Sequence, residues 1–127
     1  MHDPAPLLSL CMIVKNEQAV LARCLASVRE AVDEIVVVDT GSTDGTVDAA
    51  ISCGAKVRHL EWTGDFARAR NAAIEYASGR WVLVMDADEM LSAGHGPLLR
   101  AYLLNNPETD GYFLQVVNYF GSEKKRL

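Results

Sequence analysis

The sequence predicts an α/β protein with a mostly parallel, doubly wound sheet. Short, nearly continuous apolar runs alternate with stretches whose apolar residues recur every three or four positions. The first pattern is typical of strands buried on both faces, and the second is typical of one face of a helix. Strands joined through helices run parallel, with right-handed crossovers. A chain of 127 residues fits one such domain.

The first two strands and the helix between them are the clearest elements. Residues 7–14 (LLSLCMIV) and 34–39 (EIVVVD) are apolar runs of strand length, and the second is rich in β-branched residues. Asn16 is a favoured N-cap residue, so the intervening helix is predicted to begin just after it. The apolar stripe of this helix comprises Val20, Leu21, Cys24, Leu25, Val28 and Val32.

The same alternation continues along the chain. The later predicted elements are a short helix that stops at Gly54, a weak strand over 56–62, a helix over 65–77, a strand over 81–85, a helix over 97–104 and a strand over 112–120 of undefined partner. The helix over 65–77 is expected to bury one apolar face, formed by Phe66, Ala69, Ala73, Ile74 and Ala77.

Composition and charge exclude one broad class of partner. Twelve Lys and Arg residues against 17 Asp and Glu residues give a formal net charge of −5. No nucleic-acid partner is expected, because sequence-independent binding depends on basic residues that neutralise phosphates. The basic cluster at residues 124–126 is expected to be a solvated tail.

The cysteines and the apolar runs predict the location of the protein. Cys11, Cys24 and Cys53 lack the C-x-x-C spacing of a zinc or redox site, and an odd number of buried thiols favours a reducing compartment. Residues 1–6 are too short and too polar for a signal peptide, and no apolar run approaches the about 20 residues of a membrane helix. We expect a cytoplasmic protein, with a position at the inner face of the membrane as the open alternative.

Polar residues follow three of the predicted strands. The first strand runs into Val14, Asn16 and Glu17, the second ends at Asp39, and the fourth is followed by residues 86–88. In doubly wound sheets, ligands bind outside the carboxyl ends of the strands. These polar residues are therefore expected to converge on one edge of the sheet.

Asp86 and Asp88 form a D-x-D pair after an apolar strand. In an extended backbone, alternate residues point the same way, so both carboxylates are expected to face one small volume. Two such carboxylates repel each other unless a cation intervenes, and oxygen ligands suit Mg²⁺ or Mn²⁺. Taken alone the motif is common, and a solvated acidic loop remains an open alternative.

The turn-rich segment after Asp39 is more informative. The Asp39 carboxylate is placed to accept hydrogen bonds from a nucleobase or ribose, and Gly41 and Gly45 permit tight turns. Asp44 is expected to have a structural role, in capping or turn formation.

The segment that opens the helix over 65–77 carries further polar residues. Arg70 and Asn71 lie near the helix start, where anions are favoured, whereas Arg68 is expected to be solvated. His59 is expected to be a surface residue, and Trp62 is expected to lie in the core rather than to contact a substrate.

Four segments, residues 10–17, 33–46, 65–71 and 81–89, occur in an order that resembles the N-terminal part of family 2 glycosyltransferases. The resemblance covers roughly residues 7–91 and implies a GT-A type, Rossmann-like fold. It implies a nucleotide-diphosphate-sugar donor, most often a uridine one, and an inverting displacement with Mn²⁺ or Mg²⁺. The acceptor (glycan, lipid or protein) is not implied.

The resemblance also implies roles for individual residues. Asp39 is assigned to the base, Glu17 and Asn71 to the nucleoside region, and Asp86 and Asp88 to the metal and diphosphate. Val14, Asn16, Arg70 and Asp86 complete the predicted nucleotide-binding set.

The domain is expected to span residues 7–120, between a disordered stretch at 1–6 and a charged tail or truncation point at 121–127. Family members continue well beyond the D-x-D strand, and no acidic residue after Asp88 matches their catalytic base. We therefore expect a fragment whose base lies beyond Leu127 and which is itself inactive. A sheet edge near residues 112–120 is expected to be exposed and to favour self-association.

Three other interpretations make different demands on the sequence. A haloacid-dehalogenase-type phosphatase would carry its D-x-D motif on the first strand, and a nucleotidyltransferase would carry a glycine-rich loop there; residues 14–17 contain no glycine. The stronger alternative is a nucleotide-binding or interaction module that does not catalyse a reaction.

Overall fold

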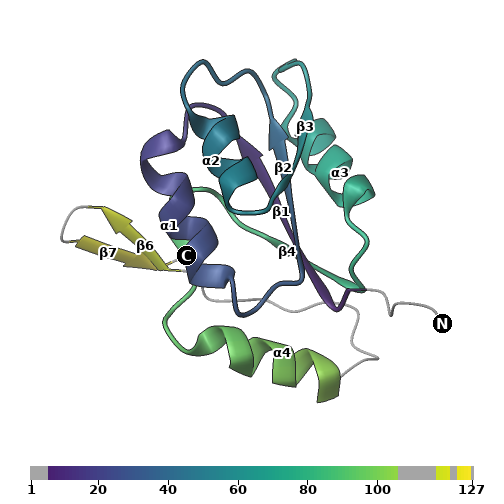
Figure 1. The fold of residues 1–127 in the computed structure, drawn as a ribbon, viewed down its shortest axis with the longest axis vertical. Coiled ribbons are helices and arrows are strands. Elements are labelled where there is room, and N and C mark those ends of the chain that lie inside the picture. Colours follow the sequence, from purple (N-terminus) through teal and green to yellow (C-terminus); the bar gives the residue numbers. More distant parts are fainter. Residues whose placement is uncertain (1–5, 106–116, 121–122, 127) are drawn as a thin grey trace.

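The computed structural model describes residues 6–105, 117–120 and 123–126. Its main sheet has four parallel strands in the order β3-β2-β1-β4 (Figure 1). The strands are β1 (Leu8–Val14), β2 (Glu34–Asp39), β3 (Lys56–His59) and β4 (Trp81–Val84). Val14 is in register with Asp39, and Asp39 with His59, so three strands end side by side.

Helices cover both faces of this sheet, which confirms the predicted fold class. Helices α1 (Gln18–Val28) and α2 (Thr46–Ser52) lie on one face, and α3 (Phe66–Tyr76) lies on the other (Figure 1). Each helix follows one strand and precedes the next, as the alternation of apolar patterns predicts.

The two faces of the sheet differ in the depth of their core. On the α1 face, large side chains such as Leu10, Met12 and Leu25 form one extended cluster. On the α3 face, Cys11, Val36 and Val38 pack against the small side chain of Ala73. The alanines of α3 therefore let that helix lie close to the sheet.

The predicted buried face of α3 is wrong for two residues. Phe66 is 64% exposed and Ile74 is 40% exposed. Only Ala69 and Ala73 of this helix are buried. Phe66 is the first residue of α3 and lies at the carboxyl edge of the sheet, whereas Ile74 is turned by about 100° from Ala73 around the helix.

The start of α1 also differs from its prediction. The helix begins at Gln18 after Glu17, and its N-cap makes no side-chain hydrogen bond. Asn16 has a positive φ of 54°, a conformation that asparagine tolerates. Its side-chain oxygen accepts a hydrogen bond from Thr43 N–H (2.8 Å) instead of capping the helix.

Helix α4 (His95–Asn105) lies at the amino end of the sheet (Figure 1). Arg100 Nη1 donates to Ala31 O (3.0 Å) and to Asp33 Oδ2 (2.9 Å), which joins α4 to the loop before β2. The predicted helix over 97–104 is therefore present and begins two residues earlier.

A second, antiparallel sheet has the order β5-β6-β7. It comprises β5 (Glu89–Met90), β6 (Val117–Phe120) and β7 (Glu123–Arg126). Strand β6, whose partner the sequence leaves undefined, pairs with β7 along its length and with β5 at residues 117–118. Residues 123–126 form a strand where a solvated tail is predicted, and residues 1–5 and 112–116 lie outside the described residues.

The cysteine thiols are free, with Cys11 and Cys24 buried as predicted and Cys53 half-buried. Burial raises the pKa of Cys11 to about 11 and that of Cys24 to about 12, so both thiols remain protonated. Within residues 6–105, the longest helices span 11 residues, and none has the length and apolarity to cross a bilayer.

Candidate functional site

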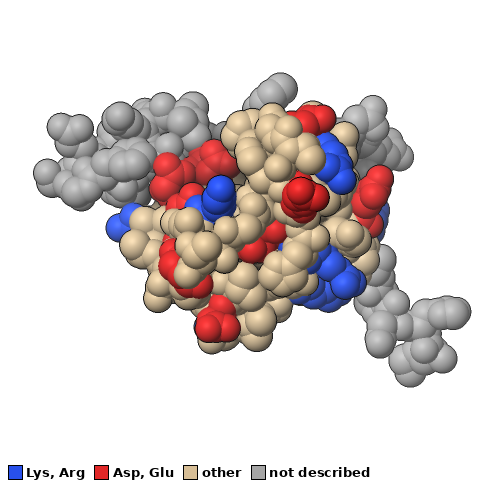
Figure 2. All heavy atoms as spheres, turned by 90° about the horizontal axis from the view of Figure 1, so that it is seen from above, with Lys and Arg blue, Asp and Glu red and all other residues tan. Residues whose placement is uncertain are grey.

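A cavity of about 570 Å³ opens at the carboxyl ends of the strands. In the view onto this end of the molecule, acidic side chains lie near the centre, with Lys and Arg side chains on both sides (Figure 2). Residues that line the cavity include Val14, Glu17, Thr40, Trp62, Phe66, Arg70, Asp86 and Asp88. The cavity is thus lined by polar residues that follow β1, β2 and β4, whereas Asn16 and Asp39 are not themselves among the lining residues.

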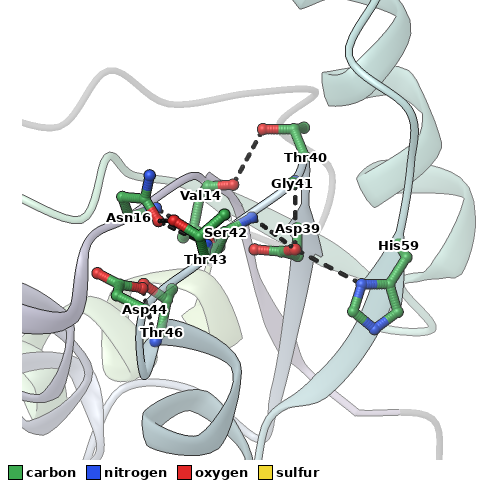
Figure 3. A network of polar contacts seen from close by, with 10 residues as sticks. All are labelled: Val14, Asn16, Asp39, Thr40, Gly41, Ser42, Thr43, Asp44, Thr46 and His59. Carbon is green, nitrogen blue, oxygen red and sulfur yellow. Dashed lines mark hydrogen bonds and ion pairs between the residues drawn. The ribbon is translucent and has the colours of Figure 1, made fainter.

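Asp39 is held rigidly but has one unused oxygen. Its side chain is buried, and Oδ2 accepts hydrogen bonds from the N–H groups of Gly41 and Ser42 (3.2 Å each). His59 Nδ1 lies 3.5 Å from the same oxygen (Figure 3). Oδ1 is buried and has no partner among the described residues. A buried acceptor without a partner costs about 1–3 kcal/mol, which a ligand donor can recover.

The loop that carries Asp39 is fixed by hydrogen bonds to the end of β1. Thr40 donates from both N–H (3.0 Å) and Oγ1 (3.1 Å) to Val14 O. Asn16 N–H donates to Ser42 Oγ (2.9 Å), and the Asn16 side-chain oxygen accepts from the loop in return. Val14 also lines the cavity. Asn16 does not line it but supports the loop (Figure 3).

Asp44 has the structural role that the sequence predicts. Its Oδ1 accepts from the N–H (2.9 Å) and the hydroxyl of Thr46, the first residue of α2. Its Oδ2 accepts from Gln18 N–H (3.4 Å). These bonds, the one from the Thr46 hydroxyl above all, lower the pKa of Asp44. Asp44 thus links the starts of α1 and α2.

Asp86 and Asp88 lie on a tight turn rather than on an extended strand. Pairing with β1 ends at Val84, and Glu89 N–H then donates to Asp86 O (3.0 Å). Glu89 is buried, and its Oε1 accepts from Asp86 N–H (2.6 Å). The predicted extended geometry is therefore wrong, although both aspartates line the same cavity.

Glu17, Asp86 and Asp88 form an acidic wall of the cavity. The pKa of Glu17 is raised by burial and then by the negative charges of Asp88, Asp86 and Asp44. Burial also raises the pKa of Glu89, and the charges of Asp86 and Asp88 raise it further against the hydrogen bond from Asp86. The charges on this wall repel one another, so a cation here would lower their free energy.

The donor set of this wall fits a hard divalent cation. Carboxylate oxygens are suitable ligands for Mg²⁺ and Mn²⁺, and Mg²⁺ keeps waters or substrate phosphates in its remaining positions. The described side chains contain no group of three or more His, Cys, Asp or Glu residues arranged to hold an ion by themselves. A metal here would therefore need further oxygen ligands, from water or from a bound substrate.

The start of α3 contributes one basic residue to the cavity. Asp65 caps the helix, and its Oδ1 accepts from Arg68 N–H (3.1 Å). Arg70 is exposed and lines the cavity, whereas Arg68 is exposed and does not. Asn71 is exposed on the next position of the helix and is not among the lining residues.

Sequence reasoning missed three residues of the site. His59 faces Asp39 because β3 is in register with β2, which no local pattern reveals. Trp62 is 36% exposed and lines the cavity with Phe66, whereas a core position was predicted for Trp62. The position of Trp62 in the chain could have indicated a place in the site, because it lies in the loop between the end of β3 and the start of α3.

A second cavity of about 600 Å³ lies at the opposite end, among α1, α2 and the starts of β2 and β3. Asp33 and Glu34 line it, but both are already hydrogen-bonded. Lys56, also in its lining, donates to Glu34 Oε2 (2.6 Å). These three charged side chains of the second cavity are therefore already paired within the protein.

Relatives with curated descriptions match most of the chain. It is 52% identical over 100 residues to a TPR repeat-containing protein of Synechococcus elongatus, covering 79% of this chain and 25% of that protein. It is 40% identical over 90 residues to the SPbeta prophage-derived glycosyltransferase SunS of Bacillus subtilis, covering 68% of this chain and 21% of SunS. The chain thus spans about a quarter of these relatives.

Solved structures share its fold. Staphylococcus aureus TarS superposes with a TM-score of 0.71 at 23% identity, over 85% of this chain and 38% of TarS. Glucosyl-3-phosphoglycerate synthase from Mycobacterium tuberculosis, in complex with Mn²⁺, UDP and glucosyl-3-phosphoglycerate, superposes with a TM-score of 0.59 at 27% identity, over 82% of this chain and 40% of the synthase. The model of the glycosyl transferase family 2 matches residues 9–126. The chain therefore belongs to glycosyltransferase family 2, and it corresponds to the N-terminal portion of that fold.

Proposed function

We propose that this chain binds a uridine-diphosphate sugar as the donor for glycosyl transfer. The observation that carries the proposal is Asp39, a buried carboxylate with one unpaired oxygen among the described residues, at the end of β2 and next in the chain to Thr40, which lines the cavity. Mycobacterial glucosyl-3-phosphoglycerate synthase, at 27% identity, has been solved with UDP and Mn²⁺, which supports the same donor class here.

The single free oxygen of Asp39 favours uracil over guanine. Oδ2 already accepts from two backbone N–H groups, which leaves Oδ1 for a ligand. Uracil presents one ring N–H between two carbonyl groups, and one acceptor satisfies it. Guanine presents a ring N–H beside an amino group, and this pair of donors needs both oxygens of a carboxylate. Adenine and cytosine have no ring N–H at this edge.

On the acidic wall of the cavity, Asp86 and Asp88 would hold Mn²⁺ or Mg²⁺, with Glu17 nearby. Bound there, the cation supplies charge neutralisation for the departing diphosphate. Arg70, on the cavity wall, adds a positive charge toward the same phosphates. Val14 shapes the wall, and Asn16 fixes the loop of Asp39.

We further propose that the whole protein transfers the sugar with inversion, using a carboxylate that deprotonates the acceptor hydroxyl. Glu89 does not suit this role, because it is buried and bound to the Asp86 N–H. We expect the base in the acceptor-binding part of the protein. The 127-residue chain should then bind donor but transfer sugar near background, because positioning both substrates supplies about 7–11 kcal/mol of the barrier reduction.

Calorimetry with UDP tests the donor proposal. UDP should bind at least tenfold more tightly with Mn²⁺ than with a chelator, because a charge pair at about 4 Å contributes about 4 kcal/mol at an effective dielectric near 20, before desolvation. Uridine, which lacks the diphosphate, is the matched control and should bind equally with and without the ion. Equal UDP affinities would remove the metal role of Asp86 and Asp88.

A transfer assay on the same preparation separates the catalytic proposal from its alternative. A nucleotide-binding module without catalysis is favoured by the small share of its relatives that the chain covers. Robust transfer to an acceptor by the purified chain would show that the base lies within these 127 residues.

A further inference from the structure

We propose that Trp62 and Phe66 form an aromatic platform on which the base of the bound nucleotide stacks. The base would then be recognised at its edge by Asp39 and on its face by these two rings. This inference rests on the proposed donor binding and adds a subsite to it.

Both rings are partly exposed to solvent, and exposed aromatic surface is unfavourable in water. Trp62 is 36% exposed and Phe66 is 64% exposed, and neither belongs to a core cluster of the described residues. Their centroids are 4.8 Å apart, with an interplanar angle of 71°. In this edge-to-face arrangement each ring supports the other, while ring surface remains free for a planar ligand.

The backbone links this pair to the end of β2. Leu60 N–H donates to Asp39 O (2.9 Å), which extends the β2–β3 pairing by one residue and places Trp62 two positions further along. On the other side, Asp65 caps α3, which fixes Phe66 as the first residue of the helix. The platform is therefore anchored at both ends, by the sheet and by the helix.

The chemistry of the cavity matches the two ends of a nucleotide. The acidic wall of Glu17, Asp86 and Asp88 suits a cation and the diphosphate that it would bind. Trp62 and Phe66 line the same cavity and offer apolar, polarisable surface. A nucleobase is the planar, weakly polar part of the ligand, and every base has a π face that stacks on aromatic rings. The base is therefore the part that fits the platform.

Binding of three nucleotides to matched variants tests the platform. With uridine monophosphate, UDP and UDP-glucose as ligands, Trp62→Ala should weaken all three by a similar factor of about ten, and Phe66→Ala by less. Trp62→Phe should retain most of the affinity, because it keeps an aromatic face. Tyr76→Ala is the control, since Tyr76 is an exposed aromatic residue of α3 that is not among the lining residues.

Fluorescence gives an independent readout. The chain has two tryptophans, so Trp62→Phe leaves Trp81 as the remaining emitter. Uridine monophosphate should quench the emission of the unaltered chain and should leave that of Trp62→Phe almost unchanged, while calorimetry should show that the variant still binds.

The outcomes separate this inference from the proposal on which it rests. Unchanged affinity of a folded Trp62→Ala variant, together with loss of binding in Asp39→Ala, would overturn the platform alone. A loss confined to UDP-glucose would assign the rings to the sugar and would also overturn base stacking. If the unaltered chain binds none of the three ligands, both proposals fail.

Discussion

Strand β2 carries a buried acidic residue at each end, and their surroundings differ. At its amino end, Glu34 Oε1 accepts from Ser9 Oγ (2.7 Å) and Ser78 N–H (2.8 Å). Oε2 accepts from Lys56 Nζ (2.6 Å) and Ser78 Oγ (2.7 Å). At the carboxyl end, Asp39 Oδ1 has no partner in the part of the chain that the structure describes.

The difference separates a structural carboxylate from a binding one. Burial alone would raise the pKa of Glu34, but hydrogen bonds from Lys56, Ser78 and Ser9 lower it to about 2. This group joins β1, β2, β3 and the turn before β4, so its interactions are complete without a ligand. Asp39 and the acidic wall leave interactions incomplete, which destabilises the free protein and favours ligand binding.

The largest expected effect is on stability at the amino end. Glu34→Ala should lower the free energy of unfolding by about 2–4 kcal/mol, because it removes several hydrogen bonds to a carboxylate and leaves the buried Ser9 hydroxyl without its acceptor. Chemical denaturation measures this. Glu75→Ala, at an exposed position of α3, is the control and should change stability by less than about 0.5 kcal/mol. Equal losses of stability in the two variants would contradict the structural role of Glu34.

Acid should remove the same contribution. Because the folded-state pKa of Glu34 lies below its ordinary value of 4.5, its stabilisation is complete above pH 4.5 and is lost as the pH falls toward about 2. The loss amounts to about 3 kcal/mol. Glu17 and Glu89 act in the opposite sense, since their raised pKa values favour protonation in the folded state. The stability of Glu34→Gln should therefore vary less steeply with pH than that of the unaltered chain.

At the carboxyl end, substitution should affect binding more than folding. Asp39→Ala should weaken UDP binding by about ten- to a hundredfold, since a hydrogen bond to a charged acceptor contributes about 1.5–3 kcal/mol. The loss should be the same with and without Mn²⁺. Asp88→Ala, measured by the same calorimetry, should matter mainly when metal is present. An Asp39→Ala variant that is folded and binds UDP normally would exclude the nucleoside role.

The smallest effect should be a gain in stability. Asp88→Asn removes one negative charge from the acidic wall, so Glu17 and Asp86 are no longer repelled by a charge at that position. The metal-free protein should become more stable by about 0.5–1 kcal/mol. The same variant should lose the rise in melting temperature that Mn²⁺ and UDP give together. A fall in metal-free stability would show that Asp88 supports the fold.

The convergence of the site was predictable from the sequence, and its details were not. Parallel strands place their ends at one edge, so the apolar runs alone bring Glu17, Thr40 and Asp86 to the same cavity. The left-handed backbone conformation of Asn16 could not be predicted, because its hydrogen-bond partner Thr43 lies in a distant segment. The turn at Asp86 likewise depends on the buried Glu89, and the position of His59 depends on strand register.

The loop over residues 40–46 has a consequence for the kinetics and entropy of binding. It is held by Val14, Asn16 and Gln18 through bonds that involve no ligand. Gln18 accepts from Gly45 N–H (2.9 Å), so even the far end of the loop is ordered. A nucleotide then meets a surface already in its binding conformation and loses little free energy to ordering the backbone. Association should accordingly follow a single phase whose rate rises linearly with nucleotide concentration, without a slower step of loop closure.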